Sequence, residues 1–248
     1  MLIDIHAHIP CGNTKEGINT IIEAAQRYGI DRIYVSSLDG YFPDSEEIKV
    51  LNNKTLKAVK ENPKLFGGAL YVNPDNKDTK DVIKRGILED GMELIKIWIS
   101  TYVDTAPAYE VAKMAIDFDI PVLIHAMHKA NGQVAHENTA QNVAALAGKY
   151  PELKIIMAHM GGNVYNGISA IEGHENVFVD ISMSIVRDDD LPYCIKKLGA
   201  KRILFGTDMP GVCYPMKIGQ VEGAGLSAPQ KELIYHKNAL RLLKRGKA

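Results

Sequence analysis

The residues of this chain best suited to chemistry are two histidines near its beginning. Residues 2–8 read Leu-Ile-Asp-Ile-His-Ala-His, which predicts an apolar strand. Alternate side chains of a strand share a face, so His6 and His8 are expected to lie side by side. Two neutral imidazoles a few ångströms apart can chelate one divalent cation. A His-x-His pair alone is a weak signal, and its weight depends on whether the fold brings further ligands to the same place.

Apolar segments alternate with segments of helical periodicity along the whole sequence. Most of the apolar segments are continuous runs, as expected for parallel strands that helices cover. The predicted strands are residues 2–8, 31–36, 65–72, 94–99, 121–125, 154–159, 177–181 and 202–207. These strand and helix units, in a chain of 248 residues, predict a single (β/α)8 TIM barrel that forms one domain over residues 1–248.

Helix boundaries support this alternation. Helical periodicity over residues 17–28, 81–90 and 139–150 stops each time at a glycine or before a proline. Ser227 and Gln230 form a capping-box pattern before a closing helix. No Gly-x-Gly-x-x-Gly motif follows the first predicted strand, which argues against an open dinucleotide-binding sheet.

The predicted barrel brings the ligand-type residues together. Active sites of these barrels lie where the strands end, and His6 and His8 end the first strand. His125 ends the fifth strand, His159 ends the sixth, and Asp208 follows the eighth. Neutral imidazoles and an anionic oxygen are the ligands that a catalytic divalent cation needs, with one position left open. The sequence therefore predicts a metal site at the mouth of the barrel.

The overall charge argues against nucleic acid as a partner. The chain has 29 Lys and Arg against 30 Asp and Glu, whereas a protein that binds a phosphate backbone usually carries a basic surplus. The denser lysine clusters fall at helical spacings typical of solvated faces.

The remaining composition indicates a protein of the cytoplasm. The sequence has neither a basic leader nor an apolar run long enough to span a membrane, so no membrane partner is expected. Cys11, Cys194 and Cys213 are widely spaced and are predicted to be free thiols.

Lys96 stands among apolar neighbours in the fourth predicted strand. A lysine in such surroundings needs a counter-charge or a polar environment, because an unpaired buried charge costs several kcal/mol. It is expected to point into the mouth of the barrel, where it can contact substrate. The alternative is an ion pair with a neighbouring acid such as Asp4.

Several further residues are candidates for binding substrate. Arg187 follows the seventh strand and can hold a carboxylate with its planar guanidinium, or it can pair with the aspartates that follow it. His128 either extends into the mouth or faces solvent. Trp98, Tyr102 and Tyr41 fall in predicted mouth loops and can stack on a planar substrate, although packing explains most aromatic residues.

The motifs at the strand ends resemble those of the amidohydrolase superfamily, in particular its amidohydrolase-related (amidohydrolase 2) branch. That branch contains small-carboxylate hydrolases, lactonases and metal-dependent decarboxylases. The resemblance covers nearly the whole chain. It rests on Asp4-Ile5-His6-Ala7-His8, Pro121-Val122-Leu123-Ile124-His125, Ala158-His159-Met160-Gly161-Gly162, Phe205-Gly206-Thr207-Asp208-Met209-Pro210 and Asn238-Ala239-Leu240-Arg241-Leu242-Leu243.

The resemblance implies a division of roles among these residues. His6, His8, His125 and Asp208 would hold one divalent metal, zinc by preference and manganese as the alternative. His159 and Asp208 would be catalytic, with His159 beside the metal-bound water. In some branches of the superfamily a lysine on the fourth strand is carboxylated and bridges two metals, whereas the branch resembled here uses one.

Two reactions remain open at such a site. The first is hydrolysis of an amide, lactone or ester of a small anionic molecule by a metal-activated water. The alternative is decarboxylation of an aromatic or unsaturated carboxylate, and a more remote one is a metal-free barrel that acts only as a binding subunit. A TatD-type nuclease is disfavoured because Gly206 replaces that family's glutamate, and a histidinol-phosphatase type because no Asp-x-His follows Thr207. The commonest assembly of such enzymes predicts a homodimer.

Overall fold

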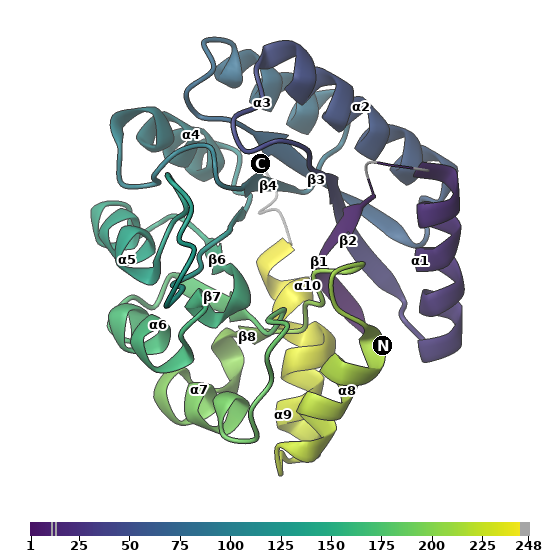
Figure 1. Cartoon of the computed structure of the whole chain (residues 1–248), viewed down its shortest axis with the longest axis vertical. Coiled ribbons are helices and arrows are strands. Elements are labelled where there is room, and N and C mark those ends of the chain that lie inside the picture. Colours follow the sequence, from purple (N-terminus) through teal and green to yellow (C-terminus); the bar gives the residue numbers. More distant parts are fainter. Residues whose placement is uncertain (11, 13, 244–248) are drawn as a thin grey trace.

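Parallel strands alternate with helices and pair in chain order from β1 to β8 (Figure 1). The computed structural model describes residues 1–10, 12 and 14–243. The strands are β1 Ile3–Ile9, β2 Arg32–Ser37, β3 Phe66–Val72, β4 Leu94–Ile97, β5 Val122–Ile124, β6 Ile155–Met157, β7 Val177–Asp180 and β8 Ile203–Leu204. The (β/α)8 TIM barrel predicted from the sequence is confirmed.

Most helices surround the ring of strands in Figure 1, whereas α10 (Asn238–Leu243) lies across the middle of the ring. The helices are α1 Thr14–Tyr28, α2 Ser45–Glu61, α3 Thr79–Leu88, α4 Ala106–Asp117, α5 Ala140–Lys149, α6 Val164–Ile171, α7 Asp190–Leu198, α8 Tyr214–Gly223, α9 Ala228–Glu232 and α10 Asn238–Leu243. The predicted helix stop is confirmed at Gly29, which has positive φ. The helix predicted to reach Asp90 ends at Leu88, before Gly91, which also has positive φ. None of the helices in the described part of the chain is long and apolar enough to cross a membrane.

The barrel closes between β1 and the segment that follows β8. Ile5 N donates to Phe205 O (3.0 Å) and His8 N donates to Met209 O (2.7 Å). This pairing explains why β8 ends at Leu204 rather than at Thr207 as predicted, because the chain leaves β7 there to follow β1.

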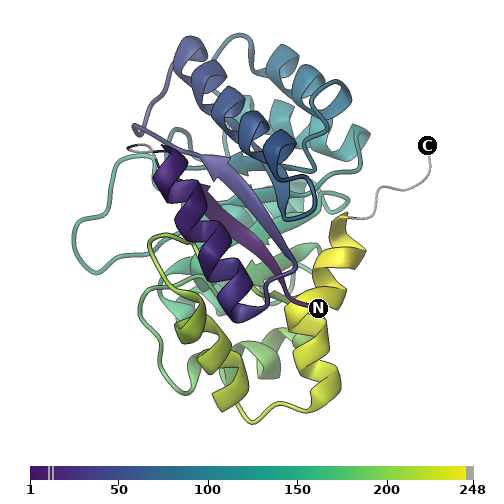
Figure 2. The ribbon, with the colours of Figure 1, turned by 90° about the vertical axis from the view of Figure 1, so that its right-hand side faces the viewer.

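The base of the barrel is filled by side chains that point inward from the strands. Ile3, Ile5 and Leu204 pack there against Ala239 and Leu242 of α10. In Figure 2 the N-terminus and α10 lie at this end of the barrel, and the loops that follow the strands lie at the other end. The closing helix therefore plugs the base and leaves the opposite mouth open for chemistry.

The state of the cysteines is partly established. Cys194 is buried and Cys213 is exposed, and both are free thiols as predicted. Cys11 lies outside the described residues.

Candidate metal centre and active site

β1 places His6 and His8 at the mouth of the barrel, where the segment after β8 brings Asp208 beside them. His6 Nε2 lies 3.0 Å from His8 Nε2. Asp208 Oδ1 lies 3.0 Å from His8 Nε2 and 3.5 Å from His6 Nε2. Three atoms of metal-ligand type thus converge, each from a different side chain.

The partners of the other ring nitrogens fix which nitrogen of each histidine is free. His8 Nδ1 lies 3.0 Å from the hydroxyl and 3.3 Å from the carbonyl oxygen of Ser36, and either oxygen can accept its proton. His6 Nδ1 lies 2.8 Å from Asp180 Oδ2 and donates to this carboxylate. Burial and the nearby Lys96 charge lower the pKa of His6 to about 3, so His6 is neutral near pH 7. With the protons on Nδ1, the Nε2 atom of each ring has a lone pair that can bind a metal.

This donor set fits a divalent cation. Two lone pairs 3.0 Å apart next to a carboxylate oxygen repel one another unless a positive charge lies between them. Bonds of about 2.1 Å place two ligand atoms about 3.0 Å apart at a right angle and about 3.4 Å apart at the tetrahedral angle. The observed separations of 3.0 to 3.5 Å match that spacing. Burial raises the pKa of Asp208, but the contact with His8 and the nearby histidines outweigh burial and keep this pKa well below its usual value.

Lys96 supplies the one positive charge that touches these atoms within the described part of the chain. Its ammonium donates from Nζ to His6 Nε2 over 2.8 Å, and the side chain is fully buried. Burial lowers the pKa of Lys96 to about 8, against the opposing charges of Asp208 and Asp180. The structure thus places Lys96 inside the barrel as predicted.

The ion pair between Lys96 and Asp4, considered as the alternative, does not form. The register of β1 shifts between Asp4 and Ala7, so Asp4 does not share a face with His6. Asp4 instead accepts hydrogen bonds from the backbone (3.0 Å) and the hydroxyl (2.6 Å) of Thr207.

A network behind His6 links it to His159. Asp180 ends β7 and is fully buried. Its Oδ1 accepts from the backbone N–H of His159 (2.9 Å) and from the hydroxyl of Ser182 (2.5 Å). Ser182 Oγ lies 2.8 Å from His159 Nδ1. Asp180, His6 and His159 form a second group of metal-ligand type, but these hydrogen bonds satisfy its atoms without a cation.

Asp180 and Ser182 were missed in the sequence analysis, although the sequence carried a signal for them. β7 is an apolar run that ends in an acid, which is the same pattern that drew attention to the other strand ends.

His159 lies deeper than the sequence analysis expected. It is buried, and its Nε2 is 3.1 Å from His125 Nδ1. Burial lowers the pKa of His159 to about 4, helped by His125, so the ring is neutral. It occupies a turn with positive φ directly after β6, over Ala158–Gly161. Gly162 directly follows this turn, and a Cβ atom on Gly162 would lie 2.6 Å from the backbone nitrogen of His128. The structure places His159 beside His125 and His6, and it does not line the pocket described below.

His125 engages an acid that the sequence analysis did not select. Its Nε2 lies 2.9 Å from Glu137 Oε1, and Glu137 also holds Lys129 Nζ at 2.7 Å. Burial lowers the pKa of His125. Its ring nitrogens face Glu137 and His159, so His125 adjoins the group of His6, His8 and Asp208 without belonging to it. Its role as a metal ligand stays a prediction.

Asp208 reaches the histidines through an unusual backbone. Its φ of 61° lies in the left-handed region, which aspartate tolerates better than most residues. Its N–H donates to His6 O over 2.7 Å. Two residues earlier stands Gly206, where a Cβ would approach Asp180 Cβ to 3.1 Å and His6 Cβ to 3.3 Å. The absence of a side chain at Gly206 therefore leaves room for Asp180 and His6 to pack closely.

A cavity of about 420 Å³ opens onto the centre. This volume falls in the range of about 300–1,000 Å³ typical of small-molecule sites. Its walls are mostly apolar or aromatic, and its polar groups belong to the residues described above. The lining residues are His8, Ile9, Pro10, Leu38, Tyr41, Trp98, Ile99, His125, Lys129, Glu137, Asp208, Pro210 and Gly211. Tyr41 and Trp98 meet edge to face, with ring centroids 5.2 Å apart.

The other predicted substrate contacts lie away from this cavity. Arg187 pairs with the buried Asp190 (3.2 Å) and lines a separate cavity of about 60 Å³. The structure therefore favours the salt bridge over the substrate contact considered for Arg187. His128 is exposed, and Tyr102 packs on His136 with ring centroids 5.3 Å apart. Of the three aromatic residues predicted to stack on a substrate, Trp98 and Tyr41 line the cavity and Tyr102 does not.

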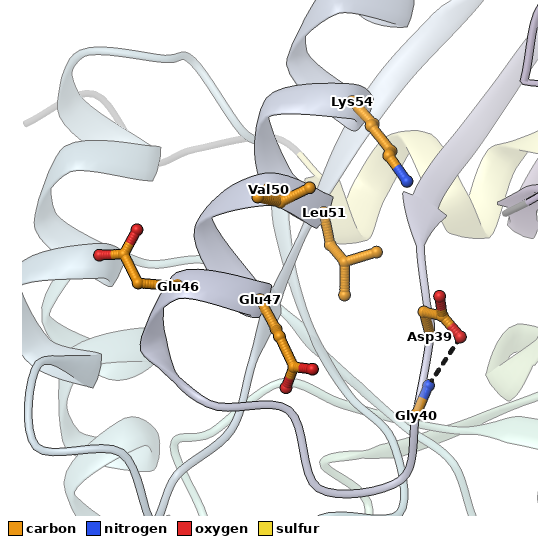
Figure 3. A pocket seen from close by; sticks show the side chains of 7 residues that line it. All are labelled: Asp39, Gly40, Glu46, Glu47, Val50, Leu51 and Lys54. Atoms are coloured by element: carbon orange, nitrogen blue, oxygen red, sulfur yellow. Dashed lines mark hydrogen bonds between the residues drawn. The ribbon is translucent and has the colours of Figure 1, made fainter.

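A second cavity lies between the loop after β2 and the start of α2 (Figure 3). Its acids have structural partners: Glu47 Oε2 accepts from Asp44 N (2.9 Å) in the cap of α2, and Glu46 pairs with Lys49 (3.3 Å). Asp39 accepts from the N–H of Gly40 over 3.0 Å (Figure 3). This cavity has no histidine in its lining, and its acids contact local backbone N–H groups or, for Glu46, the Lys49 side chain.

The family model for amidohydrolases matches residues 3–245. This chain belongs to the amidohydrolase family. The resemblance seen in the strand-end motifs is thus confirmed over nearly the whole length of this amidohydrolase. No curated protein sequence matches it.

Solved structures similar to this amidohydrolase share its barrel. One is a dihydroxybenzoic acid decarboxylase from Polaromonas with bound manganese and the inhibitor 2-nitroresorcinol, with 19% identity, a TM-score of 0.78, and 100% of this chain and 98% of that chain covered. Another is a 5-carboxyvanillate decarboxylase from Sphingomonas paucimobilis, with 15% identity, a TM-score of 0.78 and 99% of both chains covered. A third is a 4-oxalomesaconate hydratase from Rhodopseudomonas palustris, with 18% identity, a TM-score of 0.76, and 98% of this chain and 95% of that chain covered. At these identities the likeness establishes the fold.

Proposed function

We propose that this amidohydrolase is a metal-dependent decarboxylase of a small planar carboxylate, with manganese as the bound metal. The observation that carries the proposal is the cavity, where the Trp98 and Tyr41 rings stand over the same space as His8 and Asp208. Aromatic walls suit a flat ring, and ligand-type residues at one side suit its acidic oxygens. The sequence analysis favoured hydrolysis, with decarboxylation as the alternative; the likeness to two decarboxylase structures supports that alternative.

Manganese replaces zinc as the preferred metal in this proposal. The decarboxylase from Polaromonas was solved with manganese. Imidazole and carboxylate ligands suit either ion. Among the described residues, the groups of metal-ligand type contain no cysteine, whose thiolate would favour zinc. When bound, the metal would supply positive charge for the acidic oxygens of the substrate, and His6, His8 and Asp208 would hold it.

The protein's own groups are suited to the proton transfer that decarboxylation requires. The bond between the ring carbon and the carboxylate breaks, carbon dioxide leaves, and the electron pair left on the ring carbon takes a proton. His125 lines the cavity and His159 lies 3.1 Å behind it. Burial lowers the pKa values of both, so they are neutral and can take a proton and return it to the ring.

The test is a product assay that separates the reactions. Manganese-loaded protein is incubated with 2,6-dihydroxybenzoate and 5-carboxyvanillate, and released carbon dioxide is measured. In D2O, one deuterium should appear at the ring carbon that lost the carboxylate. The variant His8→Ala, which lacks one of the converging nitrogens, should release none.

Two outcomes would contradict the proposal. Release of acid from amides, lactones or esters without carbon dioxide from any aromatic carboxylate would restore hydrolysis. Addition of water to an unsaturated carboxylate would instead indicate hydration, the reaction named for the structure from Rhodopseudomonas palustris.

A further inference from the structure

The cavity contains one cationic side chain that the metal centre does not use. Lys129 lies in the loop after β5, and its side chain is 33% exposed. Of the described residues that line the cavity, it is the one lysine or arginine. Asp208, His8 and Trp98 line the same space. A molecule bound at the metal centre is therefore within the same cavity as this ammonium group.

A buried acid holds Lys129 in place. Glu137 is buried, and its Oε1 lies 2.7 Å from Lys129 Nζ. Its two oxygens also accept from His125 Nε2 (2.9 Å), Gln133 Nε2 (2.9 Å) and the backbone N–H of Val134 (3.2 Å). Four donors around one carboxylate keep it ionised and fix its position.

The loop backbone is fixed by the same residues. Gln133 Oε1 accepts from the backbone N–H of Lys129 over 2.9 Å, and Gln133 Nε2 donates to Met127 O over 2.9 Å. The position of the ammonium is thus set before a ligand arrives, and prior fixing of a binding group reduces the entropy lost on binding.

The Lys129 ammonium group has more hydrogen-bond donors than acceptors around it. A lysine ammonium carries three N–H donors, and Glu137 Oε1 is the acceptor that Lys129 Nζ finds among the described residues. Glu137 also lines the cavity, but its side chain is fully buried, whereas the lysine side chain is partly exposed. An anionic oxygen in the cavity would therefore meet the ammonium rather than the carboxylate. Arg187, which the sequence analysis considered for this role, is paired with Asp190 at a different cavity.

We propose that Lys129, positioned by Glu137, binds an anionic oxygen of the substrate and makes the cavity selective for carboxylates. This inference rests on the proposed function, because it names the group that recognises the carboxylate class of substrate.

The chain provides its own reporter for a binding test. Trp98 is the single tryptophan of the sequence, and it lines the cavity. Its fluorescence therefore reports binding at this place, and calorimetry on the same samples gives an independent dissociation constant. The probes are 2,6-dihydroxybenzoate and resorcinol, which has the same ring and hydroxyls without the carboxylate. All proteins are manganese-loaded, and metal content is measured for each.

The substitution Lys129→Met should weaken binding of 2,6-dihydroxybenzoate about tenfold, the loss expected for one partly exposed charge-assisted hydrogen bond. It should change the affinity for resorcinol less than about twofold, because resorcinol lacks the anionic group. Lys129→Arg keeps the charge and should restore most of the carboxylate affinity. The matched control is Lys80→Met, since Lys80 Nζ pairs with Glu110 Oε2 at the same 2.7 Å outside this cavity.

Three results would overturn the inference: equal binding of both probes by the parent protein, unchanged affinity in Lys129→Met, or an equal loss for both probes in that variant. The outcome is separable from that of the proposed function. Selective loss of carboxylate binding without carbon dioxide release from any substrate supports Lys129 and refutes decarboxylation. Carbon dioxide release with the same KM in Lys129→Met supports decarboxylation and refutes the role of Lys129.

Discussion

The substitution Asp180→Asn tests whether the residues behind the metal centre determine its ligands. Asn has the shape of Asp but one of its two terminal atoms is a donor. Asp180 Oδ1 accepts from the backbone N–H of His159 (2.9 Å) and of Ser182 (3.1 Å), which cannot turn away. The amide oxygen of Asn must therefore occupy this position, and the amide NH2 must face His6 Nδ1, which lies 2.8 Å from Oδ2 in the parent.

The consequence reaches the metal centre through the His6 ring. When an NH2 group faces Nδ1, this nitrogen must become an acceptor, and the single proton of the neutral ring moves to Nε2. His6 Nε2 then has no lone pair for a cation, and its N–H faces the Lys96 ammonium at 2.8 Å. Loss of such a supporting partner typically costs 10–100-fold in metal affinity, which is about 1.4–2.7 kcal/mol at 1.36 kcal/mol per tenfold change.

The measurement is manganese affinity in competition with a chelator of known affinity. The matched control is Asp190→Asn, which removes the charge of another fully buried aspartate whose partner is Arg187. This control should keep the parent's metal affinity, whereas Asp180→Asn should lose at least tenfold. A second variant, Ser182→Ala, retains the carboxylate charge and should stay within about threefold of the parent, since it leaves the His6 proton on Nδ1. Parent-like affinity in Asp180→Asn, with folding verified by circular dichroism, would refute the tautomer argument.

Four further predictions concern single side chains. Elemental analysis should show close to one metal ion per chain in the parent protein. His8→Ala removes one of the converging nitrogens and should lose most of this metal. His159→Asn should keep the metal and lose about two to four orders of magnitude in rate, the range for a missing proton acceptor; loss of metal together with rate would instead make His159 a ligand. Arg187→Met should leave KM unchanged and lower the melting temperature, because it leaves the buried Asp190 without its arginine; a raised KM would return Arg187 to the substrate. Asp44→Ala removes an N-cap that accepts from two backbone N–H groups of α2 and should lower the free energy of unfolding by about 1 kcal/mol in urea titrations, with activity intact.

The fold was predictable because its signals are local. Continuous apolar runs and glycines that end helices can each be recognised within a short window of sequence. The number of such units along 248 residues then predicts the barrel without knowledge of distant contacts. The ends of the strands were less well predicted. β6 ends at Met157 rather than at His159 because His159 enters a turn with positive φ, and this turn depends on Gly162, which approaches His128 from another loop.

The irregularity in β1 shows where a periodic rule fails. Strict alternation places Asp4, His6 and His8 on one face, and on that basis Asp4 was a possible partner for Lys96. The register shift between Asp4 and Ala7 lets Ile5 pack in the base of the barrel while His6 still faces the mouth. Such an irregularity re-aims side chains next to a functional site. The sequence carries no local mark of it, since it arises from the pairing of β1 with two neighbours.

The partners of the histidines were the part of the site that sequence reasoning could not supply. A histidine at a strand end predicts an imidazole in the mouth, but the free nitrogen depends on what the other nitrogen contacts. For His6 that contact is Asp180, 174 positions away in the sequence, and for His125 it is Glu137 in a loop without periodicity. The carboxylate behind His6 leaves Nε2 bare toward the group that fits a cation. The carboxylate that holds His125 Nε2 also holds Lys129 at the cavity wall, so the same loop that fixes this imidazole also positions the cation proposed to bind the substrate.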